Sequence, residues 1–319
     1  MAGYLDLHSE LGRSVRLYLD APCICGAKMP LRSCCLSRGT VVPRSTPSST
    51  LPPPPQTALA NERCYAAVLH DCDDRMSKEH YFSRGVLRAL AAGSANNTVR
   101  ARGLGHPEID LPPDQVGQSK ILCRRHNSAL SAIDTTGGRV FASVSEALKL
   151  IPSYSCRMFV GIDVERWLLK VACGILAAGK RPVPDDWVRI LFGRADLGPR
   201  RGLYMHVPVG KTVHENGGVA CGLFSRAGVP TGIDFTFDGV RLALDMIGDL
   251  GTHRESDVGS IKIHRPSGIW FDHQGSSSFH LGFEWGENVS ASQSVAIDVL
   301  ERRQAVNEAP RRDEPPAPT

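Results

Sequence analysis

Seven of the ten cysteines lie in two groups within the first 123 residues of this 319-residue chain, and this grouping restricts its fold more than any other feature. In a short secreted protein the same count would indicate disulfides. Here the chain is long, and its first 20 residues lack the basic and apolar blocks of a secretory signal, so we expect a reducing compartment. Clustered thiols in that setting favour metal binding, whereas the isolated Cys156, Cys173 and Cys221 are expected to be core thiols.

Composition excludes two classes of protein and leaves the partner open. Hydrophobic residues make up 42% and charged residues 22%, so the chain has enough apolar material for a sizeable core and is not disordered as a whole. The longest mainly apolar stretch, residues 158–178, is interrupted by charged residues, so neither a membrane helix nor a membrane partner is expected. The net charge of +4 permits nucleic acid as a partner without requiring it. We therefore expect a cytoplasmic protein.

The first cysteine group is compact enough to bind zinc by itself. It consists of Cys23, Cys25, Cys34 and Cys35. Four thiolates within 13 residues can close a tetrahedral zinc site that has no open position and is therefore structural. The alternative is a set of unpaired or disulfide-linked thiols. The spacing resembles the SEC-C motif, a small zinc-binding module, with Ile24 in place of a proline. That resemblance implies a module that docks on a protein partner.

The second group combines candidate zinc ligands with candidate catalytic residues. The four zinc ligands are Cys64, Cys72, Cys123 and His126. Between them Glu79 directly precedes His80, and Asn127 follows His126. A carboxylate and an amide oxygen can bind Mg²⁺, and an imidazole with a pKa near neutrality can take a proton from an attacking water. The alternative is a structural zinc ribbon that carries Glu79 and His80 on its surface.

This second group resembles the HNH (ββα-metal) endonucleases whose ββα unit is held by a zinc site. The resemblance is carried by Cys64, Cys72, Glu79-His80, Ser83, Leu87, Leu122-Cys123, His126-Asn127 and Leu130. It implies a treble-clef-like fold with His80 as general base, Glu79 and Asn127 as ligands of a catalytic Mg²⁺ or Mn²⁺, and zinc on the Cys/His set. The chain departs from the family pattern because the Cys64–Cys72 spacing is wide and no third His follows Asn127. Asp134 stands at a helical spacing from Asn127 that would allow it to substitute.

The remaining sequence predicts five segments. They are a helix and SEC-C-like zinc module (1–35), a Pro/Ser-rich linker (36–60), the HNH-like unit (61–136), an α+β domain (137–300) and a disordered tail (301–319). Apolar residues four apart predict a short helix within residues 1–20. The linker cannot form a core, so we expect the first zinc module to move freely. Residues 93–114 are polar and are expected to form an inserted loop.

The segment 137–300 combines a helical period with strand alternation. Apolar spacing predicts a helix over residues 163–178, with Arg166 and Lys170 on a solvated face. Alternation over 233–237 and 240–244 predicts a hairpin, and alternation over 279–285 predicts another strand. The expected fold class is therefore α+β, with a small ββα-metal zinc unit followed by a larger domain of helix and antiparallel sheet.

Two functions follow from these motifs. The first is a bacterial HNH-like, metal-dependent endonuclease that hydrolyses nucleic-acid phosphodiesters, with DNA expected ahead of RNA. The alternative is a non-catalytic zinc-binding adaptor that docks on nucleic acid or protein. Geometry distinguishes them, because the nuclease requires Glu79, His80 and Asn127 to face one pocket.

Overall fold

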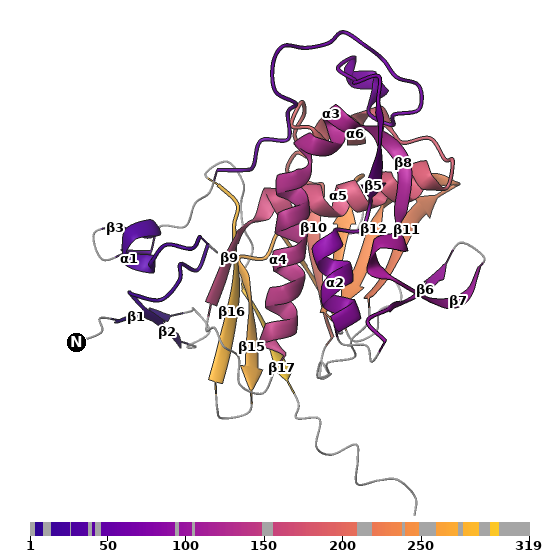
Figure 1. Ribbon diagram of the computed structural model, residues 1–319. Helices are drawn as coiled ribbons and strands as arrows, with labels where there is room; N and C mark the ends of the chain where they lie inside the picture. Colours follow the sequence, from indigo (N-terminus) through magenta and orange to yellow (C-terminus); the bar gives the residue numbers. More distant parts are fainter. Residues whose placement is uncertain are drawn as a thin grey trace, which may run out of the picture.

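The structure, a computed structural model, has an α+β fold with two larger sheets and several helices (Figure 1). The described residues are 4–8, 14–25, 27–37, 40–41, 46–92, 96–103, 106–148, 156–208, 219–237, 240–248, 260–273, 277–286 and 294–299. The predicted tail lies outside them. Within the described residues, no helix is long and apolar enough to cross a membrane.

The larger sheet contains the predicted hairpin. Its strands are β10 (Gly202–Pro208), β11 (Val219–Arg226), β12 (Val229–Phe237), β13 (Val240–Asp245) and β14 (Ser260–His264). They follow the order β11-β12-β13-β10-β14, and every pair is antiparallel. Phe235 lies opposite Leu242, and both are buried, as the alternating pattern predicts.

The second sheet is mixed rather than antiparallel. Its strands are β9 (Cys156–Val160), β15 (Gly268–His273), β16 (Ser277–Glu284) and β17 (Val295–Val299). β15 and β16 form an antiparallel pair, whereas β9 and β17 join its two edges in parallel. The strand predicted at 279–285 corresponds to β16. The parallel partners come from distant parts of the chain, so local alternation could not indicate them.

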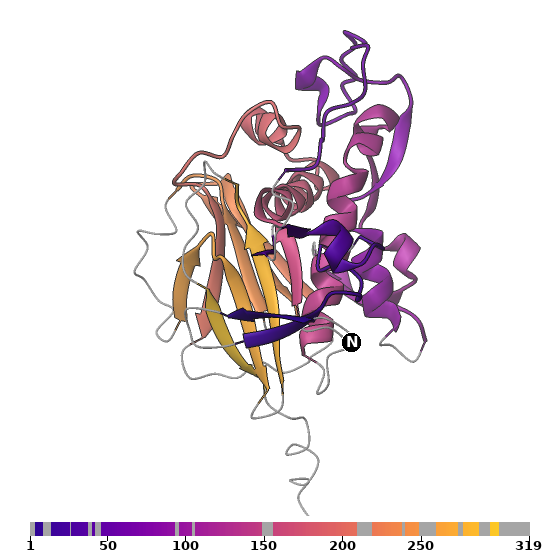
Figure 2. The same ribbon diagram turned by 90° about the vertical axis from the view of Figure 1, so that its left-hand side faces the viewer.

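The helices lie on one side of the two larger sheets (Figure 2). They are α2 (Arg84–Ala92), α3 (Arg124–Ala129), α4 (Ser131–Ala147), α5 (Gly161–Ala178) and α6 (Asp185–Leu191). The predicted helix at 163–178 is α5, and its Trp167 packs against Phe235 of β12 with ring centroids 5.0 Å apart. Gly137 of α4 touches Trp167, and a Cβ at Gly137 would lie 2.0 Å from the indole nitrogen. The boundary expected between 136 and 137 thus falls inside α4, at a tight contact between the two expected units.

The small ββ unit that carries the second group has a hairpin inserted into it. β5 (Met76–His80) pairs antiparallel with β8 (Gln118–Cys123), and α3 follows directly. Between them lie α2, the pair β6 (Val99–Gly103) and β7 (His106–Leu111), and a 3-10 turn, η2 (Pro113–Gln115). The expected inserted loop is therefore largely a β-hairpin. A second 3-10 turn, η1 (Ala67–Leu69), lies between Cys64 and Cys72.

The helix predicted within residues 1–20 is wrong. This segment forms an antiparallel pair, β1 (Tyr4–His8) and β2 (Ser14–Tyr18). Leu5, Leu7, Leu17 and Leu19 also alternate with polar or exposed positions, so the segment satisfies the strand period of two as well as the helical period. The pairing of the two strands, which sequence alone does not show, decides between the two periods.

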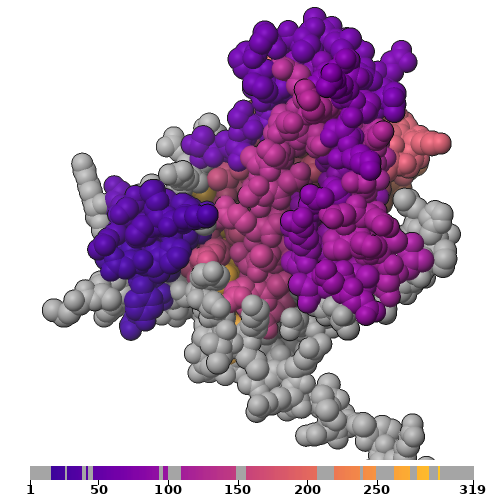
Figure 3. Space-filling view, in the orientation of Figure 1, coloured from indigo at the N-terminus to yellow at the C-terminus, as the bar shows by residue number. Residues whose placement is uncertain are grey.

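The first cysteine group packs on the rest of the molecule (Figure 3). It lies beside α1 (Leu31–Cys34), β3 (Leu36–Ser37) and β4 (Thr40–Val41). The N–H of Met158 in β9 donates to the carbonyl of Ile24 at 3.1 Å. Ile24 and Leu31 are buried in one cluster with Trp270 of β15. The structure thus holds the module against the second sheet, in contrast to the free movement expected from the linker.

Residues 46–60, which we call the strap, are held against the rest of the molecule by hydrogen bonds. Ser48 donates its backbone N–H and its hydroxyl to the carboxylate of Asp163 in α5, at 2.9 and 2.7 Å. The N–H of Thr57 donates to Asp71 at 3.0 Å, and Arg125 donates to carbonyls of the proline run. Extended proline-rich chain has free carbonyls, so it can be held by side chains without forming a core.

Candidate functional site

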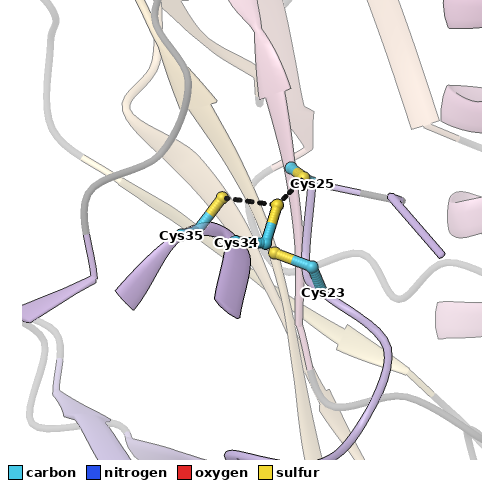
Figure 4. Close-up of side chains that lie close together, drawn as sticks. All are labelled: Cys23, Cys25, Cys34 and Cys35. Carbon is cyan, nitrogen blue, oxygen red and sulfur yellow. Dashed lines mark hydrogen bonds between the residues drawn. The ribbon is translucent and has the colours of Figure 1, made fainter. Parts of the chain in front are cut away.

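The first predicted zinc site is assembled from a turn and a short helix (Figure 4). Cys23 and Cys25 lie in the turn, Cys34 ends α1 and Cys35 follows it. The N–H of Cys23 donates to the carbonyl of Met29 at 2.9 Å, which closes the turn under the thiols. All four cysteines are free thiols, and their sulfur atoms lie within 4.8 Å of one another.

The sulfur spacing fits a zinc ion. Tetrahedral zinc with Zn–S bonds of about 2.3 Å places its sulfurs about 3.8 Å apart. The Cys25–Cys34 and Cys34–Cys35 sulfur distances are 3.5 and 3.9 Å. Disulfide-linked thiols, the alternative, would need sulfurs about 2 Å apart. The four thiols can therefore hold one zinc ion, and no open position is left for catalysis.

The second predicted zinc site brings together four residues from across 62 positions of sequence. Cys64 and Cys72 flank η1, Cys123 ends β8, and His126 lies in the first turn of α3. All four are buried, with exposed fractions of 2% or less. The wide Cys64–Cys72 spacing is accommodated because η1 folds back between them.

The His126 ring is aimed at the three sulfurs. Its Nδ1 lies 3.5 Å from the Cys64 sulfur, 3.8 Å from Cys72 and 3.2 Å from Cys123. A tetrahedral zinc ion requires about 3.6 Å between sulfur and nitrogen ligands. The thiol of Cys64 and the His126 ring lower the pKa of Cys123 to about 3, although burial opposes them. Cys123 is then a thiolate at neutral pH, the form that binds metal.

The residues predicted to be catalytic line one cleft beside this second zinc site. The cleft has a volume of about 500 Å³, and its lining includes Glu79, His80, Asn127 and Asp134. Glu79 and His80 end β5, and Asn127 lies in α3 next to a zinc ligand. The amide nitrogen of Asn127 donates to the hydroxyl of Ser77 at 2.8 Å. This bond engages the nitrogen and leaves the side-chain oxygen for another partner.

The carboxylate of Glu79 forms an ion pair with Lys170, which is not part of the HNH-like motif. Glu79 is 2% exposed, and it forms a close ion pair with Lys170 of α5, which is 1% exposed. Lys170 also contacts Asp134 at 2.6 Å and donates to the carbonyl of His80 at 2.9 Å. Burial raises the pKa of Glu79 to about 7, while the Lys170 ammonium acts in the opposite direction.

The expectation that Lys170 lies on a solvated face of its helix is wrong. Lys170 stands three residues after Trp167 and four before Gly174, so it shares their buried stripe. Ser83 extends the network, because it accepts from the Trp167 indole at 2.9 Å and donates to Asp134 at 2.8 Å. The charge of Lys170 favoured a place in solvent. The acidic partners that allow its burial lie 36 and 91 positions away in the sequence, so local spacing could not indicate them.

Three further basic residues, Lys78, Arg84 and Arg139, line the cleft and were not predicted as site residues. Arg84 pairs with the exposed Asp114 at 2.8 Å. Arg139 of α4 donates to the carbonyl of Cys25, so it connects the cleft to the first zinc module. No spacing pattern in the sequence groups these three residues, because they lie in three different elements, β5, α2 and α4.

The two Cys/His clusters of this chain could each hold a metal ion. No protein-family model, no curated protein and no solved structure matches the chain.

Proposed function

We propose that the cleft binds a nucleic-acid phosphodiester and hydrolyses it, with His80 as the general base. The unit would be HNH-like, and the Cys64, Cys72, Cys123 and His126 site would hold a structural zinc under it. DNA is the first expected substrate and RNA the second. The observation that supports this proposal is the convergence of Glu79, His80 and Asn127 on one cleft.

The charge of the cleft suits a phosphate group. Three basic residues line it, namely Lys78, Arg84 and Arg139. The two acidic residues of the lining, Glu79 and Asp134, are both paired with Lys170, so the positive charge of the lining is in excess. Basic side chains attract the nucleic-acid backbone and stabilise the negative charge that develops when a phosphodiester is attacked. Asn127 lies in α3, and its side-chain oxygen, which the bond to Ser77 does not use, can orient a water molecule.

His80 is suited to accept a proton at neutral pH. Burial lowers its pKa below the ordinary value of 6.5, and the charges of Arg84 and Lys170 act in the same direction. The carbonyl of Asp114, 3.3 Å from the His80 Nε2, and the Asp114 carboxylate act against this shift. A neutral imidazole is the form that takes a proton from water.

The expected Mg²⁺ or Mn²⁺ ligands do not fit a divalent ion as they stand. Glu79 is buried and paired with Lys170, and the same ammonium also contacts Asp134, the expected substitute ligand. A divalent ion prefers carboxylate oxygens that are free of a competing cation. The proposal therefore assigns the proton transfer to His80 and routes no step through a divalent ion.

Replacement of His80 by Ala is expected to lower plasmid nicking by about 100-fold or more, because the general base contributes on this scale. The assay uses supercoiled plasmid and zinc-loaded protein, with Mg²⁺, Mn²⁺ or no added metal. His70→Asn is the matched control, since His70 is exposed, lies outside the cleft, and has a left-handed backbone (φ 49°) that Asn tolerates. Unchanged nicking in His80→Ala would refute the assignment of the base.

A second candidate function is a non-catalytic nucleic-acid-binding unit. The observation that favours it is the neutralisation of Glu79 by Lys170, which removes the carboxylate expected for metal catalysis. In that case wild-type protein would shift the mobility of plasmid without nicking it, and Arg84→Gln would weaken the shift. The first zinc module, which exposes Arg32, would then be the expected docking point for a protein partner.

The pH dependence of nicking is expected to rise through the pKa of His80 and to level off above it. The base must be neutral to act, so activity falls as pH drops through a midpoint below about 6.5. Arg84→Gln removes one charge that lowers this pKa, so its midpoint should move upward. Rates measured from about pH 5 to about pH 8 test both statements. A wild-type midpoint above 7 would contradict the lowered pKa of the half-buried His80.

A further inference from the structure

The most unusual group in the molecule is the ammonium of Lys170 behind the cleft. Its side chain is 1% exposed, and α5 holds its stem in the main core beside Trp167. Burial of a lone ammonium is costly, so a buried lysine either loses its proton or finds charged partners. Burial alone would lower the pKa of Lys170, but the carboxylates of Asp134 and Glu79 raise it above the ordinary value.

The three hydrogen atoms of the ammonium match three acceptors. They are Glu79, Asp134 and the carbonyl of His80, with the last two at 2.6 and 2.9 Å from the lysine nitrogen. An ammonium has three donors and no acceptor, so Lys170 is saturated in this arrangement. Two of its partners are also the carboxylates nearest to the expected metal position, and the third belongs to the expected base.

A divalent ion at this position would have to displace Lys170. Two positive ions cannot share the buried carboxylate of Glu79 and the half-buried carboxylate of Asp134 without strong repulsion, because the site is largely shielded from water. Lys170 cannot move into solvent, because its helix is packed on both sides, with Gly174 against Tyr81 and Trp167 against Phe235. The fixed ammonium therefore excludes a metal more effectively than a surface lysine would.

We infer that Lys170 occupies the cation position of this cleft, and that the chain binds no divalent ion between Glu79 and Asp134. The inference deepens the proposed function by stating which cation neutralises the cleft, and it rests on that function only in taking the His80 cleft as the reacting site. Lys170 is a positioning residue, since it contacts the backbone of His80 and both acids and has no access to solvent. Within the described residues, the candidate metal sites are then the two Cys/His clusters, and Glu79 and Asp134 become available to metal only if the ammonium is removed.

The experiment is a Mn²⁺ titration of zinc-loaded protein near neutral pH, followed by the loss of the free-Mn²⁺ electron paramagnetic resonance signal. Wild-type protein is expected to bind no Mn²⁺ at the cleft. Lys170→Met keeps the apolar stem and removes the charge, so it should bind one Mn²⁺ ion per chain that wild-type protein does not bind. Adding Asp134→Asn to that variant should abolish the gain. Lys120→Met, at an exposed lysine of β8 outside the cleft lining, is the matched control and should behave as wild type.

Two outcomes would overturn the inference. One is a Mn²⁺ site in wild-type protein that Asp134→Asn removes. The other is a folded, zinc-loaded Lys170→Met variant that gains no site. If that variant does not fold, the wild-type titration with Asp134→Asn still decides the question. Failure of the nuclease proposal can be distinguished from failure of this inference. If wild-type protein neither nicks plasmid nor binds Mn²⁺ at the cleft, only the proposed function is contradicted. If wild-type protein binds Mn²⁺ there and shows Mg²⁺-dependent nicking that His80→Ala abolishes, only this inference is contradicted.

Discussion

Replacement of Cys64 by Ser is expected to release one of two zinc ions per chain and to unfold the region around α3. Each structural zinc site of this kind contributes on the order of 10 kcal/mol of apparent folding free energy. The second site also lies inside the main hydrophobic cluster, since Cys64, Cys72 and Cys123 belong to it. The His126 ring packs edge-on against Phe192 at 4.9 Å, so loss of the metal would loosen the contact between α3 and the segment after α6.

The measurement pairs zinc content with thermal unfolding. Elemental analysis should give two zinc ions in wild type and one in Cys64→Ser, with a large fall in Tm. Cys25→Ser should also lose one zinc ion but lower the Tm less, because the first site belongs to a smaller, separate cluster. Cys221→Ser is the control, since Cys221 lies in β11 outside both sites and should leave two zinc ions bound. Two zinc ions in Cys64→Ser would show that Cys64 is not a ligand.

The two Cys/His clusters that could hold zinc were predictable because a zinc site imposes its geometry on local sequence. A closed tetrahedral site needs four soft ligands in close groups, and only folding to within a few ångströms satisfies it. The structure brings both predicted sets together within 4.8 Å. Glu79, His80 and Asn127 also line one cleft, since Glu79 and His80 end β5 and Asn127 lies in α3 of the same unit, while their catalytic roles stay predictions.

The sequence did not reveal which charged residues of α5 are buried, for a physical reason. The charge of a lysine or glutamate argues for solvent unless a partner compensates for burial, and the partners of these residues are distant in sequence. Lys170 meets Glu79 from β5, and Glu165 meets Arg265, which is 100 positions away. The helix itself was predictable from its apolar period. Which of its charged residues are buried depended on tertiary contacts, so the sequence did not indicate it.

The short and extended segments failed for a different reason. Residues 1–20 satisfy both the helical and the strand period, so the choice between them depends on pairing. The strap has no apolar period at all, and its place is set by single hydrogen bonds such as that from Ser48 to Asp163. Composition predicts that such a segment forms no core, but composition does not show where a polar segment is bound.

Replacement of Glu165 by Ala is expected to destabilise the protein by about 3–5 kcal/mol, because it leaves a buried arginine without its counter-charge. Glu165 is 1% exposed and accepts from Arg265 at 2.8 Å and from the backbone N–H of Leu203 at 2.8 Å. These bonds join α5 to β10 and to the residue that follows β14, so the carboxylate connects the helix to the larger sheet. Glu165→Gln retains an acceptor oxygen and should lose less than the Ala variant.

Urea unfolding, followed by tryptophan fluorescence, measures these differences. The matched control is Asp186→Ala, which removes an ion pair with Arg201 whose side chains are 54% and 37% exposed. Exposed pairs of this kind contribute at most about 1 kcal/mol, because water already solvates both charges. Equal losses in Glu165→Ala and Asp186→Ala would mean that solvent reaches Arg265 and that α5 is not held to the sheet by this pair. A much larger loss at Glu165 would mean that the buried carboxylate of α5 depends on its tertiary partners, and the same reasoning then applies to Lys170 of that helix beside the cleft.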